Sequence, residues 1–405
     1  MCIVILLYMQ VVYERKKKML KRFVVKNYKN FRDEIVFDFG NIAGYQFNQD
    51  CLYGNLISKA IIYGRNATGK SNLGNAVLDI AYTLRGIPRF KSERAFINAD
   101  STEDYATFSY SFMFNSEEIN YEYKRKSEDE LIAEKLMIES RIIFSCDFLK
   151  SNFSFEGLKH IGASTINTKL YIDSLSQEGP DETQERRMPF LRWLISNAAF
   201  NNNSLLIKLF NYVNKMYLIN NDTDSLLIAK RNMHDFAEYL KKTDRLKDFE
   251  GFLNAMGVEC SLVLKELPDG QNMLYFKHNN IIPFAETASS GTLTATLLYR
   301  RLFLGAFGSS SKPSFLYMDE FDAFYHYEMS QNVIEYLKKY YPQTQIVFTT
   351  HNTVLMSNRI MRPDCLFLLS TKGNLTPLQK ATERELREGH NLAKMYMSGE
   401  FEQYE

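Results

Sequence analysis

The sequence predicts an α/β fold with a mixed β-sheet and a mainly helical insertion. Two observations indicate the α/β class. A strand, a glycine-containing loop and a helix follow one another within residues 59–84, and two apolar strands, 315–319 and 345–350, end in polar side chains. A third observation indicates the insertion, because residues 151–257 combine charged and Asn-rich stretches with apolar residues at helical spacing. With 405 residues, 45 % of them apolar, the chain can form the core of one large domain with such an insertion.

We expect the chain to have four parts. They are an N-terminal extension (1–18), an N-terminal lobe (19–150), the helical insertion (151–257) and a C-terminal lobe (258–405). Alternation of apolar and polar residues predicts the strands, and apolar residues at a spacing of 3.6 predict the helices. The expected elements of the two lobes are a hairpin within 20–40, strands at 59–63, 108–114, 119–123, 261–267, 272–279, 315–319, 345–350 and 365–369, and helices at 73–84, 292–304, 327–341 and near the C-terminus.

Composition indicates which partners and which cellular location to expect. Lys plus Arg (49) and Asp plus Glu (48) nearly cancel, so the net charge of +1 favours no class of partner. The five cysteines are widely spaced and form no C-x-x-C pair, which fits a reducing, cytoplasmic location. The apolar run from Cys2 to Val12 is about half of the roughly 20 residues that span a bilayer. Because its basic residues follow that run, we expect an extension without stable membrane insertion, with a weak membrane-surface anchor as the alternative.

The loop GRNATGKS matches the phosphate-binding pattern G-x-x-x-x-G-K-S and has the required context, a strand before it and a helix after it. Successive backbone N–H groups and the helix N-terminus would bind phosphates, Lys70 would reach the β- and γ-phosphates, and Ser71 would bind Mg²⁺. The sequence therefore predicts ATP and Mg²⁺ as ligands. The candidate nucleotide-binding residues are Gly64, Arg65, Asn66, Ala67, Thr68, Gly69, Lys70, Ser71 and Asn72.

Two strand ends supply the candidate catalytic groups. FLYMDE delivers Asp319 and Glu320 to the carboxyl end of a buried strand, where open α/β sheets bind ligands. Asp319 would hold Mg²⁺ through water, and Glu320 would orient and polarise the attacking water. His351 follows strand 345–350, which we expect beside the Asp319 strand, so His351 is a candidate contact for the γ-phosphate.

A second anion-binding helix start is expected at TASSGT, where small hydroxyl residues surround Gly291. One triphosphate needs only one such cradle. We therefore expect Ser289, Ser290, Gly291 and Thr292 to cap the nucleotide of a partner subunit.

These four motifs, in this order, resemble the ABC-type ATPase heads of the RecF, SMC and OLD families, and most closely the RloA-like ATPases of bacterial phage-defence loci. The resemblance implies a P-loop NTPase whose two lobes form an ABC-type ATPase head, hydrolysing ATP to ADP and phosphate. It assigns residues 289–292 to the signature that acts in trans, Asp322 to the D-loop and His351 to the switch histidine. One departure is the absence of any glutamine between Gln49 and Gln177, where these families place a Mg²⁺-sensing glutamine.

The resemblance implies a homodimer or higher oligomer held by sandwiched ATP. The expected function is that of an ATPase subunit of an antiphage defence system that controls a separate effector, for example a nuclease. A RecF-like DNA-repair ATPase and an ATP-gated scaffold with negligible turnover are the alternatives. The basic runs 15–18 and 241–247 are candidates for DNA contact. No D-x-D follows His351, so we expect no nuclease in this chain.

Overall fold

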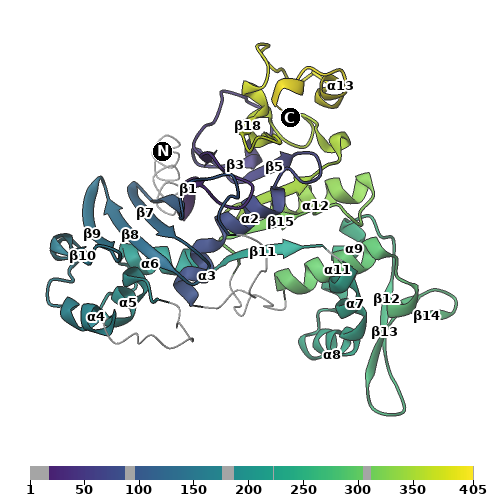
Figure 1. Cartoon of the computed structure of the whole chain (residues 1–405). Helices are drawn as coiled ribbons and strands as arrows, with labels where there is room; N and C mark the ends of the chain where they lie inside the picture. Colours follow the sequence, from purple (N-terminus) through teal and green to yellow (C-terminus); the bar gives the residue numbers. More distant parts are fainter. Residues whose placement is uncertain (1–17, 87–95, 176–186, 222, 304–311, 405) are drawn as a thin grey trace, which may run out of the picture.

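The computed structural model describes residues 18–86, 96–175, 187–221, 223–303 and 312–404. The predicted N-terminal extension lies outside the described residues except for Lys18, which begins the first strand. Two large sheets and a smaller helical lobe make up the molecule (Figure 1). Among the described residues, no helix combines the length and the apolar character that crossing a bilayer requires.

One large sheet is entirely antiparallel, and its order is β10-β9-β8-β7-β6-β1-β2. The first two strands form the predicted hairpin, and the next pair confirms the strands expected near 108–114 and 119–123. The bounds of its strands are β1 (Lys18–Lys26), β2 (Ile35–Asp38), β6 (Ala106–Phe114), β7 (Glu117–Arg125), β8 (Leu131–Ile138), β9 (Arg141–Asp147) and β10 (Asn152–Ser154).

The other large sheet is mixed, with the order β11-β15-β16-β5-β17-β18. Its first five strands run parallel, and only β18 is antiparallel. The predicted neighbours are confirmed, since the Asp319 strand pairs with the strand that precedes His351. Its strands are β11 (Met216–Asn220), β15 (Phe315–Asp319), β16 (Gln345–Thr350), β5 (Lys59–Tyr63), β17 (Leu366–Leu369) and β18 (Leu375–Pro377).

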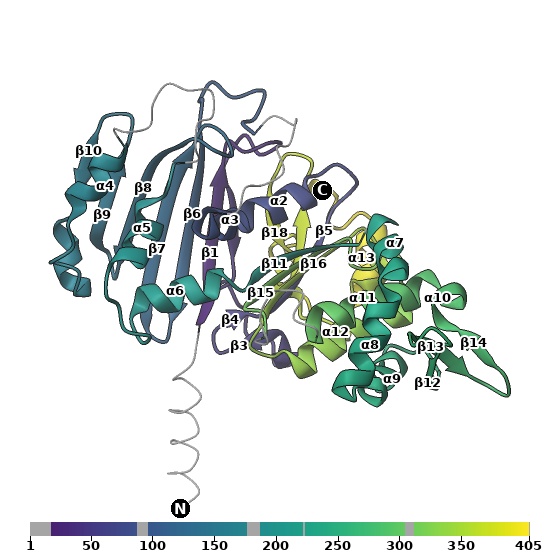
Figure 2. The ribbon, with the colours of Figure 1, turned by 90° about the horizontal axis from the view of Figure 1, so that it is seen from below.

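Helices cover these sheets and build a lobe at one end of the molecule, where a three-stranded sheet packs beside them (Figures 1 and 2). The helices are α2 (Lys70–Val77), α3 (Asp79–Arg85), α4 (Thr168–Leu175), α5 (Phe190–Asn197), α6 (Leu205–Val213), α7 (Thr223–Arg231), α8 (Met233–Thr243), α9 (Leu246–Ala255), α10 (Phe284–Thr287), α11 (Ser290–Phe303), α12 (Tyr327–Tyr340) and α13 (Leu392–Met397). The remaining strands are β3 (Leu52–Tyr53), β4 (Leu56–Ile57), β12 (Leu262–Glu266), β13 (Asn272–Lys277) and β14 (Ile281–Pro283).

Residues 151–257 are mainly helical, as expected, but they also contribute a strand to the mixed sheet. β11 pairs along its whole length with β15, with Asn220 opposite Asp319. In Figure 2 this strand connects the helices that cover the antiparallel sheet with those of the end lobe. The helical insertion therefore contributes a strand to the same sheet as β15, the strand that ends at Asp319.

The helix predicted over 73–84 is interrupted at Leu78, between α2 and α3. The hydroxyl of Tyr110 donates to the carbonyl of Ala76 at 2.8 Å and accepts from the N–H of Ile80 at 3.3 Å. Those two backbone groups would bond to each other in a continuous helix, so the inserted hydroxyl breaks the i→i−4 ladder. A side chain of the antiparallel sheet thus sets the length of the helix that begins at the glycine loop.

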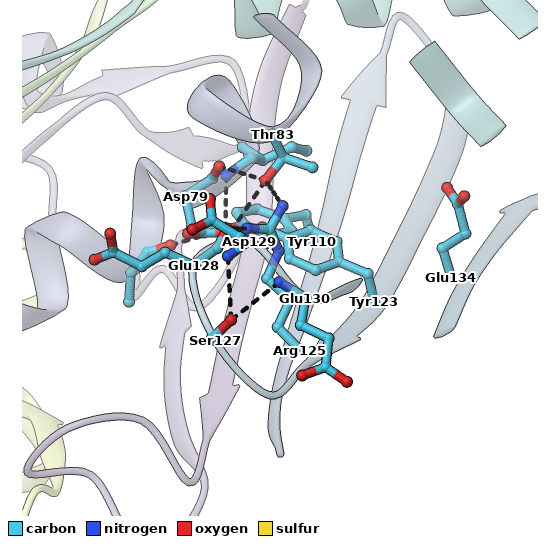
Figure 3. Close-up of polar contacts among 12 residues, drawn as sticks. Asp79, Thr83, Tyr110, Tyr123, Arg125, Ser127, Glu128, Asp129, Glu130 and Glu134 are labelled. Atoms are coloured by element: carbon cyan, nitrogen blue, oxygen red, sulfur yellow. Dashed lines mark hydrogen bonds and ion pairs between the residues drawn. The ribbon is translucent and has the colours of Figure 1, made fainter. Parts of the chain in front are cut away.

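Beneath this break lies a buried polar cluster that ties α3 to the antiparallel sheet (Figure 3). Asp79 and Arg125 are almost completely buried and lie 3.7 Å apart. Tyr123 donates to the Asp79 carboxylate at 2.6 Å, and Arg125 donates to the Thr83 hydroxyl at 2.7 Å. Arg125 and Tyr123 therefore compensate the charge of Asp79 within this cluster.

Glu134 lies on β8, and its buried carboxyl group contacts the start of α5. It accepts hydrogen bonds from the backbone N–H groups of Phe190 and Leu191 and from the hydroxyl of Tyr121. Burial raises the pKa of Glu134 from 4.5 to about 7, although these donors oppose the shift. The folded protein thus holds a proton on Glu134 over a pH range in which the unfolded chain has lost it.

We expect Glu134→Gln to remove a pH dependence of stability. A raised carboxyl pKa contributes stability that is complete below pH 4.5 and lost as the pH rises through 7. From pH 5 to pH 8, the free energy of unfolding of the wild type should fall by about 2–3 kcal/mol relative to the variant. Urea denaturation of both proteins measures this difference. A constant difference between pH 5 and 8 would contradict the prediction.

Candidate functional site

The glycine loop joins the end of β5 to the start of α2 and is held in a tight conformation. Gly69 has a φ of 103° and Ala67 a φ of 66°. A Cβ at Gly69 would lie 2.3 Å from the amide nitrogen of Asn30, and one at Gly64 would lie 2.9 Å from the carbonyl oxygen of Leu369. Only glycine fits at these two positions, so the pattern read from the sequence has a steric reason in the structure.

Lys70 is buried in the loop that it follows. Its ammonium group donates to the carbonyls of Gly64 at 2.7 Å and Arg65 at 3.1 Å. Burial lowers the pKa of Lys70, while the nearby carboxylates of Glu320 and Asp319 act in the opposite direction. The structure thus brings together the predicted phosphate-binding lysine and the predicted acidic pair.

The acidic pair lies at the carboxyl end of β15 and is fixed by the neighbouring strand. The hydroxyl of Thr349 donates to Asp319 Oδ1 at 2.6 Å and accepts from the backbone N–H of Glu320 at 2.8 Å. Asp319 is buried, whereas Glu320 is exposed and has a φ of 44°. This left-handed conformation directs the chain away from the sheet immediately after the strand, and such strain often occurs at functional sites.

Asp322 and His351 lie at the same edge of the sheet. Thr350 donates to Asp322 Oδ2 at 2.8 Å, and burial raises the pKa of Asp322 despite this hydrogen bond and the nearby His351. His351 is exposed. It shares a cavity of about 240 Å³ with the loop residues Tyr63, Gly64, Arg65 and Asn66 and with Thr353 and Tyr396.

Three residues that sequence reasoning missed hold the site in place. Asn30 donates to the carbonyl of Thr68 at 3.0 Å and accepts from Asn72 at 2.7 Å. The Tyr317 hydroxyl donates to the Lys70 carbonyl at 2.7 Å. Thr349 is the third of these residues. The sequence could have indicated it, because it is a hydroxyl residue near the end of the largely apolar strand β16. The other two act through long-range packing that leaves no local pattern.

The predicted trans signature begins α11, and the structure does not place it beside the glycine loop. Ser289 Oγ accepts from the backbone N–H of Thr292 at 3.1 Å and so caps the helix. A Cβ at Gly291 would lie 3.0 Å from the carbonyl oxygen of Phe324, which explains the glycine by packing within the chain. In both views α11 lies apart from α2 (Figures 1 and 2). Ser289 and Ser290 are exposed to solvent.

The side-chain oxygens of Asp319 and Ser71 suit a Mg²⁺ ion that is bound together with phosphates. Asp319 has one oxygen engaged by Thr349, and Ser71 is exposed at the start of α2. The described residues contain no cluster of three His, Cys, Asp or Glu side chains that could hold a metal alone. Mg²⁺ is usually held by one or two protein oxygens, substrate phosphates and water, and this site offers the protein part of that set.

The order strand, glycine loop and helix, with carboxylates at a neighbouring strand end, defines a P-loop nucleotide-binding fold. It confirms the predicted α/β class with a mixed sheet. The chain belongs to the family described as "AAA domain, putative AbiEii toxin, Type IV TA system", whose model matches residues 59–357. No curated protein matches the chain.

Similar solved structures include head domains of SMC proteins. The SMC head from Thermotoga maritima is 14 % identical, with 89 % of this chain and 98 % of that one covered and a TM-score of 0.45. The Smc head with a coiled coil and joint from Pyrococcus yayanosii is 12 % identical, with 94 % and 99 % covered and a TM-score of 0.45. The Smc head from Pyrococcus furiosus, bound to a domain of ScpA, is 16 % identical, with 90 % and 98 % covered and a TM-score of 0.43.

Proposed function

We propose that two copies of this chain hydrolyse ATP in composite sites, each built from the loop of one copy and the start of α11 of the other. One observation carries the proposal: α11, which begins at Ser290, lies apart from α2, the helix that follows the loop of the same chain (Figures 1 and 2). Ser289 and Ser290 are exposed. Their backbone N–H groups at a helix N-terminus suit a phosphate, and a second copy can bring one to them.

In this proposal the chain's own groups bind and orient the triphosphate. Lys70 exchanges its contacts with the Gly64 and Arg65 carbonyls for contacts with phosphate oxygens. Ser71 and Asp319 would hold Mg²⁺, which when bound supplies positive charge next to the β- and γ-phosphates.

The remaining groups act on the γ-phosphate and the dimer. Glu320, held at the end of β15 through Thr349, orients and polarises the attacking water. His351 contacts the γ-phosphate, and Asp322 belongs to the loop that meets the partner. Hydrolysis then releases the two copies.

We further propose that this ATPase serves antiphage defence and controls a separate effector protein. The family description supports this role, because it names an abortive-infection-type toxin of a toxin–antitoxin system. Affinity purification of the tagged chain from its own host, before and after phage infection, tests the proposal. Recovery of a second protein whose amount depends on infection supports the role, and its absence in both samples contradicts it.

Complementation between two inactive variants tests the composite site. Lys70→Met removes the phosphate-binding cation, and Ser290→Glu places a carboxylate where the partner's γ-phosphate would lie. The new carboxylate stabilises a helix start, so the second variant should fold normally. Each variant alone should lack ATPase activity. Mixed in equal amounts, they should recover up to about a quarter of wild-type activity, because half the dimers contain one intact site of two.

A matched mixture controls this experiment. Lys70→Met combined with the double variant Lys70→Met/Ser290→Glu forms no intact site in any pairing and should stay inactive. If the first mixture is no more active than its separate components, the sites do not form between two copies of the chain.

A further inference from the structure

A second cavity, of about 420 Å³, lies at the opposite edge of the mixed sheet from the nucleotide site. Lys215, Ser314 and Thr344 line it and immediately precede β11, β15 and β16. These strands are parallel and carry the acidic pair and His351 at or just after their other ends. A strand of five residues separates the two edges by roughly 16 Å, so the cavity is separate from the ATP site.

Four lysines surround this cavity. They are Lys18, Lys208, Lys215 and Lys312, and among the described residues that line the cavity none is acidic. Lys208 and Lys215 are half-buried, and neither has a salt-bridge partner in the described part of the chain. Lys312 donates to the carbonyl of Tyr340, an uncharged acceptor, at 2.8 Å. Like charges gathered around a hollow repel one another, and an anionic ligand would relieve that repulsion.

Hydrogen bonds between other residues help to hold the walls of the cavity. Ser314 donates to the carbonyl of Tyr212 at 2.5 Å, and Thr344 donates to that of Pro313 at 2.7 Å. Buried Tyr212 also donates to Gln345 at 2.5 Å. The cavity is therefore preformed, and its volume lies in the range of small-molecule sites, about 300–1,000 Å³.

We propose that this cavity binds a small ligand carrying two or more phosphate groups. A phosphate group carries roughly −1.5 to −2 charges at neutral pH, so two of them can compensate the ammonium groups of Lys208, Lys215 and Lys312. Lysine binds phosphate as a point charge and needs no bidentate geometry, which suits side chains that reach the hollow from separate segments. The concave arrangement favours a small ligand over a nucleic acid, whose backbone requires an extended basic surface. This inference does not depend on the proposed ATPase mechanism.

Calorimetric titration of the full chain with inorganic tripolyphosphate tests the proposal. The titration is made in the Lys70→Met background, which removes the cation of the glycine loop. Lys208→Glu combined with Lys215→Glu should weaken tripolyphosphate binding more than tenfold. Because both side chains are only half-buried, the variant should fold, and thermal unfolding checks this. The matched control, Lys159→Glu with Lys169→Glu, makes the same charge change at exposed positions remote from the cavity.

The outcomes separate the proposal from its rivals. Loss of binding in the cavity variant alone supports the proposal. Equal losses in both double variants indicate general attraction between charges and overturn it, as does unchanged binding in the cavity variant. Titration with a short DNA duplex completes the test. If the duplex binds through Lys208 and Lys215 and tripolyphosphate does not bind, the surface is a nucleic-acid site and the small-ligand proposal is overturned. If the cavity variant does not fold, Lys208→Gln alone should still weaken binding severalfold.

Discussion

We expect Glu320→Gln to lower the rate of the proposed ATP hydrolysis roughly 100-fold or more, because the amide cannot accept a proton from the attacking water. The side chain is exposed at the end of β15, so the change should leave the fold and the glycine loop intact. Lys70 and Asp319 remain in place, and nucleotide affinity should therefore be retained. Steady-state phosphate release measures the rate, and size-exclusion chromatography with ATP should show the variant trapped as a nucleotide-bound dimer.

The matched control is Glu335→Gln, which makes the same chemical change at an exposed position of α12. This variant should hydrolyse ATP at the wild-type rate. If Glu320→Gln neither slows hydrolysis nor traps a dimer, another group activates the water. A wild type without measurable phosphate release would instead favour an ATP-gated scaffold.

Asp79→Ala should cost about 3–5 kcal/mol of folding free energy, because it leaves the buried guanidinium of Arg125 without its carboxylate. Both side chains are at most 2 % exposed, so water cannot replace the lost partner. The variant also removes an acceptor for the hydroxyl of Tyr123, at 2.6 Å. A loss of this size is a large part of the 5–15 kcal/mol that is typical of a folded protein. Urea denaturation measures it.

Two further variants control this prediction. Asp79→Asn keeps the shape and one carbonyl acceptor but removes the charge, so it should be less destabilising than Asp79→Ala. Asp104→Ala breaks an exposed ion pair with Lys126 and should have little effect, because exposed pairs contribute little. A wild-type-like stability of Asp79→Ala would show that the cluster is not needed for the fold.

Much of the mixed sheet was predictable from sequence. β5, β15, β16 and β17 are short apolar runs bounded by polar residues or glycine, and each was predicted within a residue or two of its bounds. β11 was not predicted, because MYLIN follows an Asn-rich helical stretch and its identity as a strand depends on pairing with β15. Strands β8 to β10 were also not predicted, because LIAEKLMI, the first of them, has two apolar triplets around Glu134 and Lys135 in place of an alternating pattern.

The candidate site was predicted from motifs that are local in sequence. GRNATGKS, MDE and TTHN each place their polar side chains at the end of a single strand. Because β5, β15 and β16 run parallel and adjacent, those ends meet at one edge of the sheet. The supporting contacts of Asn30 and Tyr317 with the glycine loop could not be predicted, since they join residues 38 and 247 positions apart.

The sequence by itself determined that a phosphate-binding loop, an acidic strand end and a polar strand end occur in this chain, because a short run of residues specifies each of them. Only the tertiary structure decided where the first helix breaks, which strand borders β15, and that four lysines surround a second cavity. These features depend on segments that are distant in sequence and meet only when the sheets are packed. A contact between such segments leaves no periodic pattern in either one, so it cannot be predicted from a short stretch of the sequence.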